Sequence, residues 1–206
     1  MSDAAALSHP AVEPAESPLT PESWGKLGMW IFLVGDAIGF GTLLAAYGAM
    51  RATSVDWPSP YQVLGINLTA AMTFLLICSS VTMVKGLEWL SKGDRDRCRW
   101  FLFFTALGGT IFVSCQAYEW QHLIHEGLHI NGNPFGAALF GTAFFLVTGF
   151  HGLHVTGGVI YLISIIRWVS HRPEPAASYN AVEIVGLYWH FVDLVWIMVF
   201  TFMYLL

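Results

Sequence analysis

The stretch "FFLVTGFHGLHVTGGVIYL" (144–162) decides the fold class, because it is a long apolar run without a single charged carboxylate, lysine or arginine. As a helix it is long enough to cross most of a hydrocarbon core of about 30 Å. Its apolar residues are continuous and do not alternate with polar ones, which excludes a strand of a membrane barrel. Two histidines, His151 and His154, lie near its middle, where an isolated helix would be in contact with lipid.

The composition extends this interpretation to the whole chain. Of its 206 residues, 55% are hydrophobic and 11% are charged, whereas soluble domains carry about 25% charged residues. This deficit predicts an integral membrane protein. The chain has no basic run, so we expect no nucleic-acid partner. The three cysteines are scattered without a C-x-x-C pair, so we expect inert, packed thiols.

Five apolar stretches are long enough to be membrane-spanning helices, and the predicted fold is therefore an all-α, polytopic bundle. The predicted spans cover about 26–50, 61–86, 99–122, 135–167 and 181–206. The segment 1–25 is rich in proline and poor in large apolar residues, so we predict a disordered polar tail. The transmembrane domain then comprises residues 26–206.

The basic residues predict the orientation of the spans. Eight of the nine Lys and Arg residues lie on the side of the N-terminal tail, either at the ends of spans or in the loops that follow the second and fourth spans, and Arg51 alone lies on the other side. The positive-inside rule therefore predicts a cytoplasmic N-terminus and a periplasmic C-terminus. Four arginines flank the inner headgroups, where we expect them to bind anionic lipid. They are Arg95, Arg97, Arg99 and Arg167.

Five ionisable side chains share one depth in the predicted bundle, since a helix rises about 1.5 Å per residue from its inner end. They are Asp36, His151, His154, His190 and Asp193. Ionisable groups at mid-membrane cost about 2.5–3.5 kcal/mol each on insertion scales and normally face other helices. His151 and His154 are three residues apart, as are His190 and Asp193, so the members of each pair share one helix face. In the simplest arrangement, these faces of spans 1, 4 and 5 point toward one another, and imidazole–carboxylate hydrogen bonds form between them.

The histidines allow three interpretations. They are a polar link between helices, they ligate haem from facing helices as in a free-standing dihaem electron carrier, or they form the proton relay of a small transporter or channel. The residues alone leave all three open.

Outside this layer, Glu119 is the acid to explain. It ends the third span beside Tyr118 and Trp120, and we predict an interfacial acid in an aromatic belt. No nucleophile elbow, phosphate-binding loop or H-E-x-x-H motif occurs. We therefore assign no catalytic residue and no metal ligand to this chain.

Four stretches together resemble subunit III of haem–copper terminal oxidases. "FFLVTGFHGLHVTGGVIYL" (144–162) and "YWHFVDLVW" (188–196) are similar to two specific signatures of that family. "LGMWIFLVGDAIGF" (27–40) resembles its first shared helix, and "QAYEW" (116–120) its Gln…Glu segment. The similarity runs in order from about 26 to 206 and fits the shorter, five-helix form. Asp36 stands where the family usually has Glu, so the partners of that carboxylate are not carried over.

The resemblance implies a non-catalytic subunit of a proton-pumping cytochrome c oxidase in a bacterial inner (plasma) membrane. It implies that haem and copper lie in the partner subunits, and that this chain contacts subunit I mainly, subunit II and other subunits. It also implies bound phospholipid in a cleft between helices, stabilisation of subunit I over many turnovers, and support of proton uptake or oxygen access. Subunit III of a quinol oxidase is the alternative within the family, and the helper subunit associated with nitric oxide reductase is a third relative.

Overall fold

The computed structural model describes residues 24–137, 139–171 and 175–206, and five helices within them are long and apolar enough to cross a membrane. These helices are α1 (Trp24–Thr53), α3 (Ile66–Ser91), α4 (Arg95–His125), α5 (Leu139–His171) and α6 (Pro175–Phe200). A short helix, α2 (Pro60–Val63), precedes α3, and a π-helix, η1 (Thr201–Leu205), continues α6. The described part of the chain contains no strand element, so the prediction of an all-α, five-span protein is confirmed.

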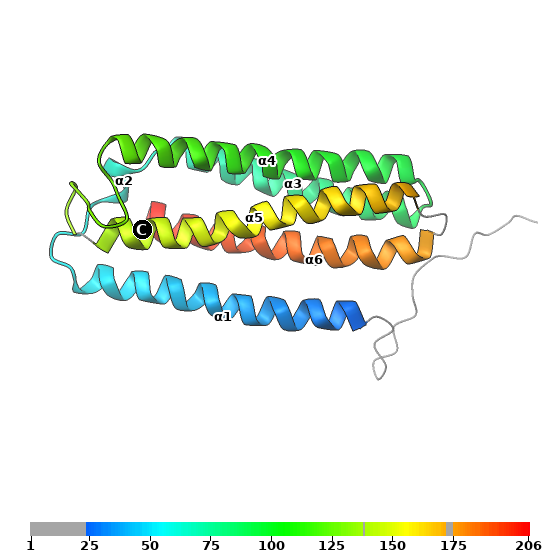
Figure 1. Cartoon of the computed structure of the whole chain (residues 1–206), viewed down its shortest axis with the longest axis horizontal. Helices are drawn as coiled ribbons and strands as arrows, with labels where there is room; N and C mark the ends of the chain where they lie inside the picture. Colours follow the sequence, from blue (N-terminus) through cyan, green and yellow to red (C-terminus); the bar gives the residue numbers. More distant parts are fainter. Residues whose placement is uncertain (1–23, 138, 172–174) are drawn as a thin grey trace, which may run out of the picture.

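Four of the long helices form a closed ring, and α1 lies outside it. Helix α3 packs on α4 and α6, and α5 packs on the same two helices. Figure 1 shows α1 running beside this body, with which it makes contact through α5 and α6. Its buried side chains, Leu33, Phe40 and Tyr47, follow one another at intervals of seven residues. Helix α1 is therefore held along one narrow stripe.

Polar contacts tie α1 to the C-terminal helices at both ends. Near its start, Lys26 Nζ lies 3.1 Å from Glu183 Oε2 of α6. Near its end, the Arg51 guanidinium donates to the backbone carbonyl of Leu206. Since the apolar contact of α1 is narrow, these two contacts fix where its ends lie relative to α6.

The observed helices differ from the predicted spans mainly where charged residues continue a helix. Helix α3 extends to Ser91 because Glu88 pairs with Lys85 at 2.7 Å and with Lys92 at 2.6 Å, one helical turn away on either side. Helix α4 begins at Arg95 because the Asp94 side chain accepts a hydrogen bond from the Arg97 backbone N–H at 3.0 Å. Both helices thus extend beyond the apolar stretch that hydropathy detects.

At the other end, α3 and α5 begin later than predicted. Residues 60–63 form the separate turn α2, and Gly65 precedes the first residue of α3. The loop before α5 is fixed to the α1–α2 connection, because the Ala137 backbone N–H donates to the carbonyl of Asp56 at 2.9 Å. The polar tail predicted over 1–25 lies outside the described residues, except that Trp24 and Gly25 belong to the first turn of α1.

Trp189 of α6 lies at the centre of the ring. Its indole is 1% exposed, and its Nε1 donates to Ser79 Oγ of α3 at 3.0 Å. A Cβ atom at Gly109 of α4 would lie 2.3 Å from the ring, and one at Gly158 of α5 would lie 2.9 Å from it. A single side chain thus touches three neighbouring helices, and the two glycines leave the space that it fills. About two helical turns further along α6, Trp196 Nε1 donates to Thr73 Oγ1 of α3 at 2.9 Å.

Candidate functional site

One contact between ionisable side chains joins α1 to α5. His154 Nε2 lies 3.2 Å from Asp36 Oδ2, with side-chain exposures of 14% and 10%. The two atoms lie within ion-pair distance, but Asp36 Oδ2 has no hydrogen-bond partner among the described atoms. The rings of Phe40 and Phe150 pack on the imidazole with centroids 5.2 Å and 4.6 Å away. Aromatic walls keep this contact in a medium of low polarity, where charge interactions are strong.

The other ring nitrogen of His154 decides where a proton lies. Nδ1 is 2.7 Å from the backbone carbonyl of Phe150, and a carbonyl only accepts, so Nδ1 carries a hydrogen. In the neutral ring Nε2 would then be an acceptor that faces the Asp36 carboxylate, which is also an acceptor. A proton between Nε2 and Oδ2 removes this conflict, whether the pair is imidazolium–carboxylate or imidazole–carboxylic acid. The pair is therefore a candidate to bind one proton.

His151 links α5 to α6 instead of joining that pair. Its side chain is 1% exposed, and its Nε2 lies 3.2 Å from the backbone carbonyl of Val192, to which it donates. Its ring packs against Trp196, with centroids 4.8 Å apart, and against Phe112 at 5.7 Å. Nδ1 has no hydrogen-bond partner among the described atoms. His151 is thus a buried neutral link between two helices.

His190 and Asp193 of α6 both contact the hydroxyl of one serine of α3. The Ser80 hydroxyl donates to Asp193 Oδ2 at 2.8 Å and lies 3.3 Å from His190 Nδ1. Because the serine proton goes to the carboxylate, its oxygen is free to accept from the imidazole N–H. The three side chains form a short directed chain from imidazole to hydroxyl to carboxylate. It joins α6 to α3.

The polar layer therefore differs from the arrangement expected from sequence. The structure brings Asp36 and His154 together, but it does not bring the His190–Asp193 face toward span 4. That face points to α3, which the sequence analysis did not include in the layer. Sequence gave no signal for Ser80, since a serine inside an apolar span is common and costs little.

Glu119 is buried, and the prediction of an interfacial acid needs correction. Its side chain is 3% exposed. Gln116 Nε2 donates to Oε2 at 3.1 Å, and the Tyr204 hydroxyl donates to the same atom at 3.0 Å. Thr69 Oγ1 of α3 lies 3.0 Å from Oε1. The carboxylate thus holds α3, α4 and the π-helix η1 together near one end of the bundle.

A sequence signal for this burial exists on α4. Phe112, Gln116, Glu119 and Leu123 are all buried, and their spacing of four, three and four residues puts them on one helix face. The neighbouring Tyr118 is 65% exposed. The aromatic neighbours of Glu119 in sequence therefore point elsewhere, because adjacent helical residues lie about 100° apart.

The predicted headgroup arginines lie at one end of the bundle, where α4 begins and α5 ends. Arg97 lies 3.1 Å from Asp94 and stacks on Trp89, with 4.1 Å from its guanidinium carbon to the ring centroid. Arg99 lies 3.4 Å from Asp96, and Arg167 is exposed on α5. Arg95 starts α4 and also has an interaction partner. These residues form no cluster with the buried histidines and carboxylates.

The described histidines, cysteines and acids are too dispersed to form a metal site. Within 24–137, 139–171 and 175–206, no three His, Cys, Asp or Glu residues lie close enough together to hold a metal ion. Apart from His151 Nδ1, the ring nitrogens described above face protein groups of their own or neighbouring helices. The arrangement can therefore fasten helices and hold protons.

Comparison with known proteins agrees with the resemblance seen in the sequence. Residues 22–206 match the family described as "Cytochrome c oxidase subunit III". A "Probable cytochrome c oxidase subunit 3" of Nocardia farcinica is 38% identical over 181 residues, covering 87% of this chain and 86% of the relative. The protein of the same name from Mycobacterium tuberculosis is 34% identical over 206 residues, covering 99% and 98%. "Quinol oxidase subunit 3" of Bacillus spizizenii is 34% identical over 180 residues, covering 87% and 86%.

The match spans nearly the whole chain, including all five long helices and every member of the polar layer. The relatives are third subunits of oxidases, which are oxidoreductase complexes. On these findings, the chain belongs to the cytochrome c oxidase subunit III family of haem–copper oxidases.

Proposed function

We propose that this chain is the non-catalytic subunit III of a proton-pumping cytochrome c oxidase in a bacterial inner membrane. It packs mainly on subunit I, contacts subunit II and other subunits, and carries no redox centre of its own. Haem and copper in the partner subunits reduce O₂ to water. The chain stabilises the catalytic subunit through many turnovers and supports proton uptake or oxygen access.

The observation that carries this proposal is the engagement of His154. Both of its ring nitrogens face protein groups, the Phe150 carbonyl and the Asp36 carboxylate. A haem ligand needs one free nitrogen aimed at iron. This geometry favours a link between helices over the dihaem carrier that the sequence alone left open.

The Asp36–His154 pair also supports the proposed part in proton uptake. A proton bound by the pair would lie between α1 and α5, next to side chains that are not fully buried. A group that keeps a proton at mid-membrane and reaches the edge of the protein is a suitable donor to a neighbouring subunit. We therefore expect this chain to influence proton uptake by the oxidase through the Asp36–His154 pair.

Lipid binding is proposed for the space between α1 and α6. A groove of about 510 Å³ lies there, lined by small residues of α1, such as Gly41 and Ala45, and by large apolar residues of α6, such as Phe191 and Met198. The ends of α1 are fixed by the Lys26 and Arg51 contacts, so the groove is held open between two anchored points. Its apolar lining and its depth suit a phospholipid acyl chain.

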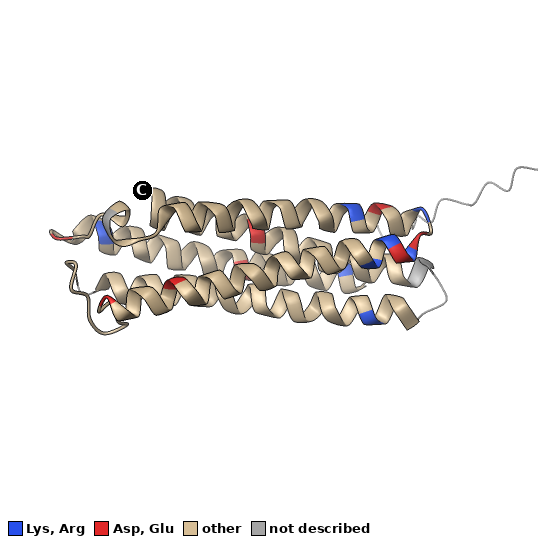
Figure 2. Ribbon diagram, turned by 90° about the horizontal axis from the view of Figure 1, so that it is seen from above, with Lys and Arg blue, Asp and Glu red and all other residues tan. Residues whose placement is uncertain are grey.

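The proposed orientation follows from the charges. Figure 2 shows most of the blue Lys and Arg residues at one end of the bundle. That end contains the starts of α1 and α4 and the ends of α3 and α5, whereas Arg51 lies in the last turn of α1 at the other end. The excess of positive charge supports a cytoplasmic N-terminus and a periplasmic C-terminus.

Two measurements test the proposal. Affinity purification of the tagged chain from its own membranes should recover a haem- and copper-containing oxidase. The chain expressed and purified alone should give no α-band in a reduced-minus-oxidised spectrum. An α-band equivalent to one haem per isolated chain, or recovery without any oxidase, would reject the assignment.

A quinol oxidase subunit III is the second candidate, favoured by the 34% identity to the Bacillus spizizenii protein. The electron donor is chosen by the partner subunits, so it must be measured on the complex. Oxygen consumption by the purified complex with reduced cytochrome c, and separately with a quinol, separates the two candidates. Activity with quinol alone would replace cytochrome c in the proposal and would leave the role of this chain unchanged.

A further inference from the structure

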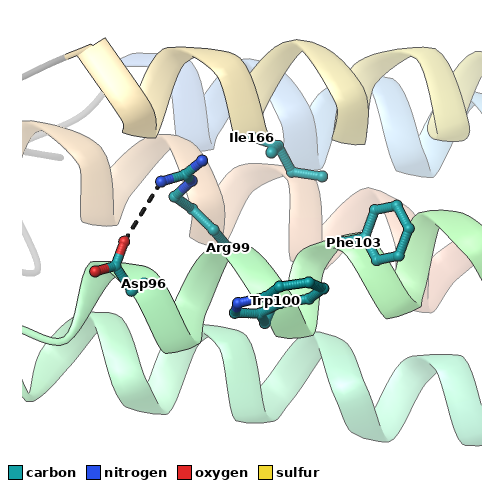
Figure 3. Close-up of a pocket in the computed structure, with 5 residues that line it drawn as sticks. All are labelled: Asp96, Arg99, Trp100, Phe103 and Ile166. Atoms are coloured by element: carbon teal, nitrogen blue, oxygen red, sulfur yellow. Dashed lines mark hydrogen bonds and ion pairs between the residues drawn. The ribbon is translucent and has the colours of Figure 1, made fainter.

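A groove lies between the cytoplasm-proximal ends of α4 and α5, away from the α1–α6 groove. Its volume is about 480 Å³, and Asp96, Arg99, Trp100 and Phe103 of α4 and Ile166 of α5 line it (Figure 3). The four α4 residues have the spacing i, i+3, i+4, i+7 and so share one helix face. Because α4 packs on α3 and α5, whereas α1 packs on α5 and α6, the two grooves are separate.

The lining changes character with depth along α4. Asp96 and Arg99 are charged and come in the first turns of the helix, Trp100 follows, and Phe103 lies one turn deeper. At about 1.5 Å per residue, these four side chains span roughly 10 Å along the helix axis. Trp100 is 63% exposed and Phe103 47% exposed. Charge, then an interfacial tryptophan, then an apolar ring is the order in which a phospholipid presents its headgroup, glycerol region and acyl chain.

Arg99 is the arginine that lines this groove, and its side chain is partly exposed. In Figure 3 its guanidinium reaches from α4 toward α5, and the dashed line marks its contact with Asp96. The distance of that contact is 3.4 Å, and the side chains are 45% and 87% exposed. Arg97, by contrast, stacks on Trp89 and pairs with Asp94 at 3.1 Å. Arg99 can therefore bind a further anion, whereas Arg97 is already held on the protein.

We propose that this groove binds one phospholipid with an ethanolamine-type headgroup. The Arg99 guanidinium binds the phosphate, the Asp96 carboxylate accepts from the primary ammonium, and one acyl chain runs past Trp100, Phe103 and Ile166. This site rests on the proposed role of the chain as a lipid-binding membrane subunit, and it assigns to that role a second place and a lipid class.

The acid beside the arginine selects the headgroup. A phosphate bound by Arg99 brings a negative charge close to Asp96, which repels it unless the headgroup supplies a cation. A glycerol headgroup has no cation, and so leaves the repulsion uncompensated. A choline headgroup has a cation without N–H donors, whereas a primary ammonium offers three hydrogens to the carboxylate. The Arg–Asp pair thus matches the two charges of the ethanolamine headgroup.

The test is a lipid titration of the full-length chain, purified in detergent and observed by native mass spectrometry. The probes are phosphatidylethanolamine, phosphatidylglycerol and phosphatidylcholine with identical acyl chains. We expect the ethanolamine lipid to bind tightest. Arg99→Gln should weaken it about tenfold, which corresponds to one charged contact, and Asp96→Asn should abolish its advantage over phosphatidylcholine. Arg97→Gln is the matched control two residues away. Because Arg97 is held by Asp94 and Trp89, this variant should bind all three lipids as the unchanged chain does, contrary to the expectation from sequence.

Three results would overturn the inference. If Arg99→Gln and the unchanged chain bound the ethanolamine lipid equally, Arg99 and Asp96 would be an exposed ion pair without a role in lipid binding. Tighter binding of phosphatidylglycerol would identify an anionic-lipid site instead. Full retention of the headgroup preference in Asp96→Asn would remove the carboxylate from recognition. Co-purification of the Arg99→Gln chain with the oxidase separates this question from the proposed function, because assembly should persist when this site fails.

Discussion

Replacing Gly158 with alanine adds one methyl group to α5 at the point where α6 packs most closely. The new Cβ would lie 2.9 Å and 3.0 Å from two ring carbons of Trp189, and 3.2 Å from a ring carbon of Tyr188. Ordinary carbon contacts are about 3.5–4.0 Å, so the ring must move by about half an ångström. Trp189 has little room to move, because Gly109 lies on its other side and Ser79 holds its Nε1.

The expected cost follows from two opposing effects. Overpacking a tight core costs about 1–3 kcal/mol, and replacing glycine in a helix gains about 0.5–1 kcal/mol. Gly157 is the matched control, since its nearest neighbour is the Tyr188 hydroxyl at an ordinary 3.7 Å. Gly157→Ala should be as stable as the unchanged chain or slightly more stable. The difference between the two variants, about 1–3 kcal/mol, then reports the close contact of α5 with the Trp189 and Tyr188 rings.

Thermal unfolding of each purified full-length variant in one detergent, followed by circular dichroism, measures this difference. For a chain of this size, 1 kcal/mol shifts Tm by about 2–4 °C. Gly158→Ala should therefore unfold several degrees below Gly157→Ala. Equal midpoints would show that the α5–α6 packing around Trp189 is looser than the contacts indicate, and would refute the reasoning.

The remaining predictions concern the buried carboxylates. Glu119→Leu should lower the free energy of unfolding by about 2–4 kcal/mol, because the Gln116 amide and the Tyr204 hydroxyl lose their acceptor. The control is Glu126→Leu, which replaces an exposed acid at the same helix end and should leave the unfolding midpoint nearly unchanged. Equal effects of the two substitutions would contradict the account. Asp193→Leu should cost about 1–3 kcal/mol by leaving its polar neighbours unsatisfied, and should shorten the working life of the assembled oxidase while its initial rate survives. Immediate loss of O₂ reduction in a fully assembled Asp193→Leu complex would point to a direct redox role. Asp36→Ala should alter lipid retention or proton uptake by the complex, measured by lipid analysis and by proton release per electron; no change in either would exclude this carboxylate from both roles.

Hydropathy and charge were sufficient to predict the number and type of the spans. The ends of the helices were missed where side-chain pairs replace hydrophobicity as the stabilising term. Glu88 with its two lysines carries α3 to Ser91, and Asp94 starts α4 inside a charged segment. A hydropathy window does not detect such helical turns, because they are polar.

Depth along each helix was also predictable, whereas the direction of each face was predicted only in part. Counting residues from the inner ends put Asp36 and His154 at one level, and the structure places them in contact. The same counting could not show that His190 and Asp193 face α3, because Ser80 carries no distinctive pattern. Glu119 was misplaced because its neighbours in sequence were weighed more than its neighbours on the helix face, Phe112, Gln116 and Leu123.

The central claim is that this chain keeps a haem–copper oxidase active without carrying a redox centre. The most direct measurement compares oxygen consumption by the purified complex with and without this chain, over thousands of turnovers. We predict that both preparations start at similar rates and that the complex lacking the chain loses activity much sooner. A complex that lacks the chain and is inactive from the first turnover, or one that lasts as long as the complete complex, would contradict the account.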